Sequence, residues 1–195
     1  RYSSSAASDV YKRQALFTFL TGLYLLWYLD YKNSYSIGIS LGSLMATIMF
    51  LNVWLIIWPN QKKVIAGTED AAQAGAKAAL ASRTNTLFSF PMLYFMIYSA
   101  HISDGKNYFY EIPGVAASGW NMPALYIGTA IILAIEANAI FGKMRGFMES
   151  VKAVIHSGLI LTVLFALLVY YYWFDIFETF TSLTLFDSIL WVSSL

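Results

Sequence analysis

Cysteine is absent from this chain of 195 residues, and charged residues make up only 12% of it. Without cysteine the chain forms no disulfide bond, thiolate metal site, iron–sulfur cluster or covalent haem attachment through C-x-x-C-H. The sequence also lacks a phosphate-binding glycine loop, a Ser/His/Asp set and a metal-spaced cluster. Because the net charge is only +1, no overall field attracts nucleic acid. We therefore expect neither a metal site nor a nucleic-acid partner.

The sequence is rich in long runs of apolar residues. Hydrophobic residues make up 58% of the chain, whereas soluble domains carry about 25% charged residues, so this chain cannot cover itself with water-facing groups. Apolar runs of about 20 residues cross a bilayer as helices. The sequence therefore predicts an all-α, polytopic transmembrane helical bundle within residues 15–174. About five spans are expected, at 15–29, 37–58, 84–103, 122–141 and 153–174.

Both ends of the chain depart from this pattern. Residues 1–14, RYSSSAASDVYKRQ, are polar and serine-rich without a start methionine, and they resemble a translated sequencing-adapter read-through; a genuine polar tail is the alternative. The run at 15–29 is shorter than a full span, which we interpret as N-terminal truncation. Residues 175–195 carry acidic residues among apolar ones, which predicts an interfacial helix or the start of a sixth span.

The stretch NVWLIIWPNQKKVI at residues 52–65 predicts where the second span ends. Tryptophan is typical of the headgroup region, and a proline lacks the N–H that would continue the helical ladder. We therefore expect the helix to end at Trp58 and Pro59. Residues 60–83 are then expected to form a solvated connector, in which Thr68 caps a surface helix.

Two features within the spans predict how the helices pack. Small residues allow close helix contact, so the second span is expected in the interior of the bundle. Its stripe of small residues comprises Gly38, Gly42, Ser43 and Ala46. In the third span Pro91 is expected to kink the helix and to free a carbonyl group, which Ser89 or a neighbouring helix would satisfy.

The distribution of lysine and arginine predicts the orientation. Leaving out residues 1–14, one side of the predicted bundle holds Lys62, Lys63, Lys77, Arg83, Lys143, Arg145 and Lys152. The other side holds Lys32 and Lys106. Because cytoplasmic loops carry an excess of these residues, we expect loops 60–83 and 142–152 in the cytoplasm and the C-terminus outside.

Glu136 is an ionisable residue inside the fourth span. Such residues usually face the bundle interior, bind a partner or carry protons. Asn52 lies near the same cytoplasmic end and Arg83 begins the third span there, so convergence of the three would form a polar patch on the inner side of the bundle. In the alternative, structural interpretation, Glu136 reaches toward the helix end and pairs with Lys143 or Arg145.

The two histidines, His101 and His156, are candidate haem ligands, because histidines from facing helices hold b-type haems. A helix from Arg83 would place His101 roughly 27 Å higher, near the outer face, whereas His156 lies near the inner face. They therefore cannot ligate one haem b together, and each would need a further histidine. The alternative is an interfacial histidine hydrogen-bonded to water or to a neighbouring helix.

Three ordered stretches carry a family resemblance: ALFTFLTGLYLL, ATIMFLNVWLIIWPNQKKVI and ASRTNTLFSFPMLYFMIYSAH. Together they resemble the membrane domain of the bacterial membrane-bound urate oxidase family, also called cytochrome-c-linked urate hydroxylase. The resemblance covers residues 15–103 and, more loosely, 121–165. It implies a bacterial inner-membrane protein that oxidises urate to 5-hydroxyisourate and passes the electrons to a c-type cytochrome.

The chain departs from this family pattern in two ways, since it has no C-x-x-C-H and lacks the first spanning helix with its histidine. At matched positions, the resemblance leads us to expect that Arg83 and Asn85 hold a helix end or an anion, and that His101 lies on the electron-exit side. The candidate catalytic residues are Glu136, Arg83, Asn85 and Asn52.

Three functional hypotheses follow from these observations. The leading one is an integral membrane component of a urate-oxidising, cytochrome-c-linked oxidoreductase. The second is a non-enzymatic membrane anchor or subunit of a respiratory complex, and a neighbouring gene for a c-type cytochrome would favour the first over it. The third is a proton-coupled transporter that uses Glu136, although no inverted repeat of broken helices is visible.

Overall fold

The computed structural model describes residues 2–31, 36–101 and 122–170, and every regular element within them is helical. This confirms the predicted all-α class. The elements are α1 (Tyr2–Tyr31), α2 (Ile37–Leu51), the π-helical η1 (Asn52–Ile57), α3 (Trp58–Ala66), α4 (Ala71–His101), α5 (Met122–Phe141), the 3₁₀ turn η2 (Gly146–Met148) and α6 (Val151–Tyr170). Because α2, η1 and α3 run on without a break, the described chain forms five long helices.

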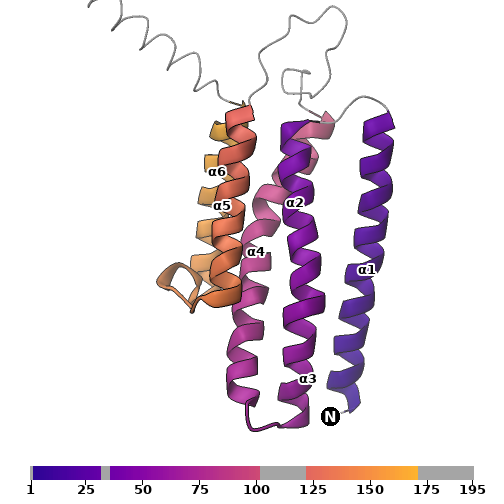
Figure 1. Cartoon of the computed structure of the whole chain (residues 1–195), viewed down its shortest axis with the longest axis vertical. Helices are drawn as coiled ribbons and strands as arrows, with labels where there is room; N and C mark the ends of the chain where they lie inside the picture. The colour runs from indigo at the N-terminus through magenta and orange to yellow at the C-terminus, as the bar shows by residue number, and fades with distance from the viewer. Residues whose placement is uncertain (1, 32–35, 102–121, 171–195) are drawn as a thin grey trace, which may run out of the picture.

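The long helices lie side by side along the long axis of the molecule (Figure 1). Helix α4 is the central element, since it packs against α2 and η1 on one side and against α5 and α6 on the other. Helix α1 packs mainly against the continuous helix formed by α2, η1 and α3. The turn between α3 and α4 and the loop between α5 and α6 lie at the same end of the bundle, as the charge distribution predicts.

Among the described residues, three helices are long and apolar enough to span a membrane: Ile37–Ala66, Pro123–Phe141 and Val151–Val169. They include the predicted span at 37–58, all but the first residue of the one at 122–141, and most of the one at 153–174. The predicted spans at 15–29 and 84–103 are helical in α1 and, as far as His101, in α4, but these helices are not among the three. Residues 102–103 and 171–195 lie outside the described residues.

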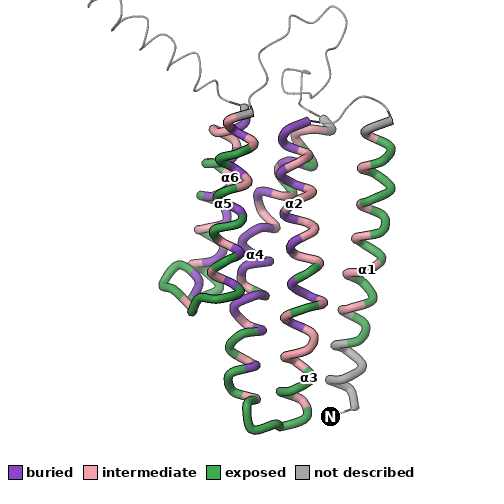
Figure 2. The backbone as a smooth tube through the Cα atoms, in the orientation of Figure 1, coloured by how far each residue is buried: buried purple, intermediate pink, exposed green. Residues whose placement is uncertain are grey.

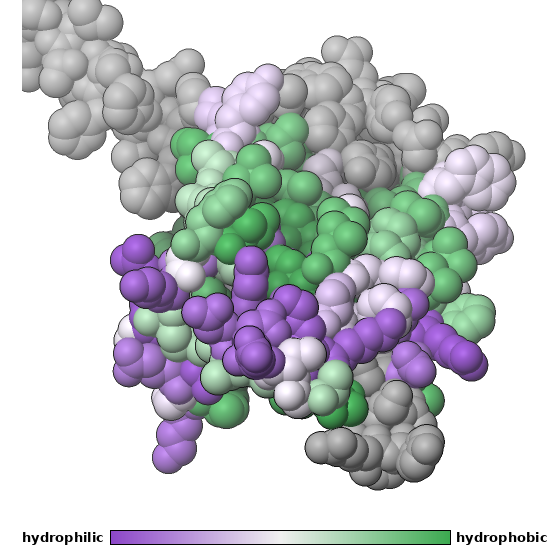
Figure 3. All heavy atoms as spheres, turned by 60° about the horizontal axis from the view of Figure 1, so that its bottom comes forward, coloured by the Kyte–Doolittle hydropathy of each residue, from purple (hydrophilic) through white to green (hydrophobic). Residues whose placement is uncertain are grey.

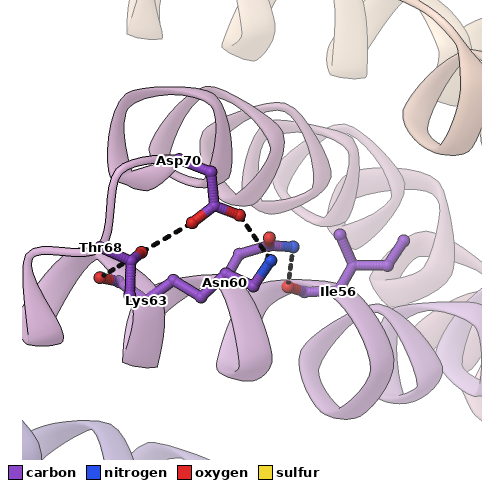
Figure 4. A network of polar contacts seen from close by, with 5 residues as sticks. All are labelled: Ile56, Asn60, Lys63, Thr68 and Asp70. Carbon is purple, nitrogen blue, oxygen red and sulfur yellow. Dashed lines mark hydrogen bonds and ion pairs between the residues drawn. The ribbon is translucent and has the colours of Figure 1, made fainter.

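The second helix does not end at Trp58 and Pro59, contrary to our expectation, but continues to Ala66. The backbone widens into a π-helical segment at this point, and the N–H of Trp58 donates to the carbonyl of Val53, five residues back. Proline is tolerated where such an adjustment changes the ladder. The side chain of Asn60 also donates to the nearby Ile56 carbonyl, at 2.7 Å (Figure 4).

The link between α3 and α4 is a short turn at residues 67–70, so the predicted solvated connector at 60–83 is mostly helix. Gly67 ends α3 in the left-handed conformation, with φ of 70°, and its N–H donates to the carbonyls of Lys63 and Val64. Glycine adopts this conformation without steric cost. The backbone N–H of Thr68 donates to the Lys63 carbonyl at 3.3 Å, so Thr68 closes the end of α3 and does not cap α4 through its side chain.

An ion pair spans this turn. The Lys63 ammonium donates to Asp70 at 2.7 Å, and the Thr68 hydroxyl donates to the other oxygen of the same carboxylate, also at 2.7 Å (Figure 4). These two hydrogen bonds hold the pKa of Asp70 below its usual value. Because the pair is exposed, we expect salt to weaken it.

The apolar core lies where α2, α4, α5 and α6 meet (Figure 2). Its largest fully buried side chains include Phe88 and Phe95 of α4 and Phe165 of α6. Gly42 is buried, and a Cβ atom added there would lie 3.3 Å from the Cβ of Phe95. Gly42 of the small-residue stripe therefore allows close contact between α2 and α4, as predicted for an interior helix.

Helix α4 contains Pro91, which is buried in the bundle, and the helix continues beyond it. The ring removes one backbone donor and thereby frees the carbonyl four residues earlier, that of Leu87. The hydroxyl of Ser89 donates at 2.7 Å to the carbonyl of Thr86 instead. Of the two expected partners for the freed carbonyl, Ser89 was therefore wrong, and a neighbouring helix stays a prediction.

Candidate functional site

Three polar side chains from three different helices meet inside the bundle. The amide nitrogen of Asn52 donates to the side-chain oxygen of Asn85 and to the carboxyl oxygen Oε2 of Glu136, each at 3.0 Å. The three residues are 2%, 7% and 8% exposed, respectively. We call them the amide–carboxyl cluster. Both amides and the carboxyl group are therefore withdrawn from solvent and bonded to one another.

The backbone near the end of α2 anchors this cluster. Asn52 is the first residue of the π-helical segment, and its N–H donates to the carbonyls of Ile48 and Met49. The amide nitrogen of Asn85 donates at 3.0 Å to the same Met49 carbonyl. Asn85 of α4 therefore hydrogen-bonds both to the backbone and to the Asn52 side chain at the α2–η1 junction. These contacts orient the Asn52 amide toward α5.

Arg83 does not join the cluster, so Arg83, Asn52 and Glu136 do not together form one polar patch. Its guanidinium Nη1 donates to the carbonyl of Met148 and approaches the sulfur of Met144 at 3.4 Å. Met148 ends the 3₁₀ turn η2 and is fully buried. Arg83 therefore binds a helix end in the loop between α5 and α6 and fastens that loop to α4.

The structural alternative for Glu136, a salt bridge at the helix end, is also not what the structure shows. The side chain of Arg145 donates at 3.1 Å to the side-chain oxygen of Asn138. Among the residues described, the recorded salt bridge is the one between Lys63 and Asp70. The carboxyl group of Glu136 is therefore held by an amide and not by a cation.

The two histidines do not form a common site. His101 is the last residue of α4, and its side chain lies outside the described residues. His156 lies in the first turns of α6, at the opposite end of the bundle; it is exposed, and its Nδ1 lies 2.7 Å from the Lys152 carbonyl. Since a pair of axial histidines is not defined by the described side chains, haem b stays a prediction. Within those residues no group of three or more metal-ligating side chains occurs.

Sequence reasoning missed an aromatic and cationic contact beside the π-helical segment. The ammonium of Lys12 lies 4.1 Å from the ring centre of Trp54 and 3.6 Å from that of Trp58. The indole N–H of Trp58 donates at 3.3 Å to Asp9. Lys12 and Asp9 belong to residues 1–14, which lie outside the predicted bundle at 15–174. The available signal in the sequence was a pair of tryptophans four residues apart, followed by Lys62, which also lies over Trp58 at 3.6 Å.

Fold and site together define a class: an all-helical bundle with three helices able to span a membrane and a buried carboxyl group at the junction of three helices. Within this chain, residues 35–112 match the family model described as urate oxidase N-terminal. The matched region contains Asn52 and Asn85, whereas Glu136 lies beyond it. The match supports a relationship to urate oxidases. Comparisons with curated proteins and with solved structures returned no match.

Proposed function

We propose that the chain is an integral membrane component of a urate-oxidising oxidoreductase that passes electrons to a c-type cytochrome. The observation that carries this proposal is the match to the urate oxidase N-terminal family over residues 35–112. The match covers α2, η1, α3 and α4 and therefore two of the three members of the amide–carboxyl cluster.

Membrane integration is supported by the surface of the bundle. Large apolar side chains are exposed along α5 and α6, among them Tyr126, Leu133, Ile160 and Val163. Hydrophilic residues gather over the end that carries the turn at 67–70 and the loop at 142–150, and hydrophobic residues cover the bundle beyond it (Figure 3). A bilayer would cover the apolar belt, because contiguous apolar surface of this extent is rare on soluble monomers.

Orientation can be tested directly, because the chain has no cysteine and single cysteines therefore report without a background. Lys77 is exposed on α4 near the polar end, and we propose that this end faces the cytoplasm. In intact cells, an impermeant maleimide should label Lys106→Cys but label Lys77→Cys only after lysis. Labelling of Lys77→Cys in intact cells would overturn the orientation.

The activity test uses membranes that contain the full chain, supplied with urate and an oxidised c-type cytochrome. The proposal predicts urate consumption together with cytochrome reduction, both absent from membranes without the chain. An exposed-site variant, Lys77→Ala, should retain both rates and serves as the matched control. If the membranes bind a c-type cytochrome but neither reaction occurs, the chain is an anchor and the proposed activity is wrong.

A further inference from the structure

Glu136 stands apart from the other carboxyl groups whose burial the structure describes. It is 8% exposed, whereas the others are exposed to solvent: Asp9, Glu69, Asp70 and Glu149. It also lies within a helix long and apolar enough to span a membrane, Pro123–Phe141. Intramembrane ionisable residues are costly and usually functional, so its surroundings decide what it can do.

Among the side chains that the structure describes, the elements packed against α5 bring no cation to this carboxyl group. Residues 37–57 contain no charged residue, and Glu136 is the only charged residue of α5. On α4, Lys77 is exposed and Arg83 binds the Met148 carbonyl. On α6, the charged residue Lys152 and the histidine His156 are both exposed.

The charged residues of the loop between α5 and α6 are also turned to solvent. Lys143, Arg145 and Glu149 are exposed, and the Arg145 side chain binds Asn138. An ionised carboxylate without a cation is expensive to bury, whereas its neutral form is not. A carboxyl group in this setting is not locked in the charged state by a salt bridge and is free to take up a proton.

The partner of Glu136 suits both protonation states. The amide nitrogen of Asn52 donates to Oε2 of Glu136, and this oxygen accepts a hydrogen bond either as a carboxylate oxygen or as the carbonyl oxygen of the protonated acid. Asn85 holds Asn52 in place from α4. Asn52 also opens the π-helical segment, a kind of irregularity found frequently at functional sites.

We propose that Glu136 is an exchangeable proton-binding site inside the bundle, held for that purpose by Asn52 and Asn85. In the protonation step, the carboxylate takes one proton to form the neutral acid, and no other bond changes. This site is defined by its own contacts and does not depend on the identity of the substrate.

A second part rests on the proposed function. Addition of water to urate with loss of two electrons releases two protons, and the electrons reduce two molecules of a c-type cytochrome. Glu136 accepts one of these protons, while the second is released to solvent. Proton acceptors in such positions contribute about a hundredfold or more to a rate.

The site is tested by infrared titration of the purified chain with ¹³C-labelled glutamate. The chain should show a protonated glutamate C=O band that gains intensity on acidification and is absent from Glu136→Gln. In Asn52→Leu the band should move to higher frequency, since it loses the hydrogen bond to its oxygen. Glu149→Gln, which removes an exposed carboxyl group, should leave the band unchanged. The proposal is overturned if the wild-type spectrum contains no titrating glutamate band, or if its titrating band persists in Glu136→Gln.

If Glu136→Gln does not fold, Glu136→Asp replaces it. Aspartate carries no label in this preparation, so the isotope shift of the band should disappear while a carboxyl band remains. Persistence of the isotope-shifted band in Glu136→Asp would assign it to another glutamate and overturn the proposal.

Measurements of urate turnover distinguish the proton-binding site from its proposed role in urate oxidation. With urate and a c-type cytochrome, Glu136→Gln should lose about a hundredfold in rate and lose the pH dependence of the wild-type chain. Wild-type turnover that Glu136→Gln retains unchanged refutes the role in urate oxidation. Absence of turnover in the wild-type chain refutes the proposed function instead, and the infrared titration then decides the proton site alone.

Discussion

Removal of the Asn52 amide is the substitution that most directly tests how the three helices are held together. In Asn52→Leu, two buried acceptors lose their donor at once, because the same nitrogen serves Asn85 and Glu136 at 3.0 Å. Interhelical hydrogen bonds in membrane proteins average about 0.6 kcal/mol, and a buried acceptor left without a donor costs about 1–3 kcal/mol. We therefore expect the free energy of unfolding to fall by about 1–3 kcal/mol.

A double-mutant cycle separates the energy of the Asn52–Glu136 hydrogen bond from the effect of changing the side-chain shape at either position. When Asn52→Leu is combined with Glu136→Leu, the acceptor disappears together with its donor, so the double variant should be more stable than the sum of the single effects predicts. Reversible unfolding in mixed detergent micelles, followed by helical circular dichroism, measures each corner. Asn60→Leu is the matched control, because its amide bonds only to the Ile56 carbonyl one turn earlier.

One result of this double-mutant cycle would contradict the expected coupling between Asn52 and Glu136. Independent sites add within about 0.3–0.5 kcal/mol. Asn60→Leu combined with Glu136→Leu should stay within that limit. If Asn52→Leu and Glu136→Leu are additive to the same degree, the amide and the carboxyl group contribute no mutual stabilisation, and the cluster is a coincidence of packing.

Three further predictions concern the turn and the core. Because Lys63 lowers the pKa of Asp70, the carboxylate stabilises the turn above its usual pKa of 3.8, and this stabilisation is lost as the pH falls through the lowered pKa. The protection of the turn amides, measured as their exchange rate relative to the intrinsic chemical rate at each pH, should therefore fall in acid, and Asp70→Asn should abolish that dependence. Gly67→Ala should cost roughly 1 kcal/mol in unfolding free energy, because φ is 70°; an unchanged midpoint would contradict this. In the core, a Cβ atom at Gly158 would lie 2.5 Å from the Phe90 ring, so Gly158→Val should lower the unfolding free energy by about 1–3 kcal/mol, and Phe90→Leu should restore part of it.

Much of the fold was predictable because hydrophobic length and charge act locally along the chain. The apolar runs beginning at Ile37, Met122 and Ala153 predict helices that the structure contains, and basic residues predict that both short connections share one end of the bundle. The extension of the second helix past Pro59 was not predictable in the same way. It depends on a change of backbone register at Asn52–Ile57, which no residue type specifies by itself.

Part of the site was also predictable, because polar residues in apolar runs must find partners. The sequence places Glu136 and Asn52 near the same end of the bundle, and in the structure they share a hydrogen bond. The exclusion of Arg83 was not predictable, since its side chain is long enough to reach either the cluster or the loop between α5 and α6. The loop carbonyl of Met148, which Arg83 binds, is a product of tertiary packing and leaves no pattern in the sequence.

The most direct test of the proposed function is the stoichiometry of urate consumption by the purified chain with an oxidised c-type cytochrome in excess. Two-electron oxidation of urate by a one-electron acceptor predicts two molecules of cytochrome reduced for each urate consumed, without uptake of oxygen. Urate consumption that requires oxygen and leaves the cytochrome oxidised would contradict the proposed electron route, and absence of urate consumption would contradict the proposed function itself.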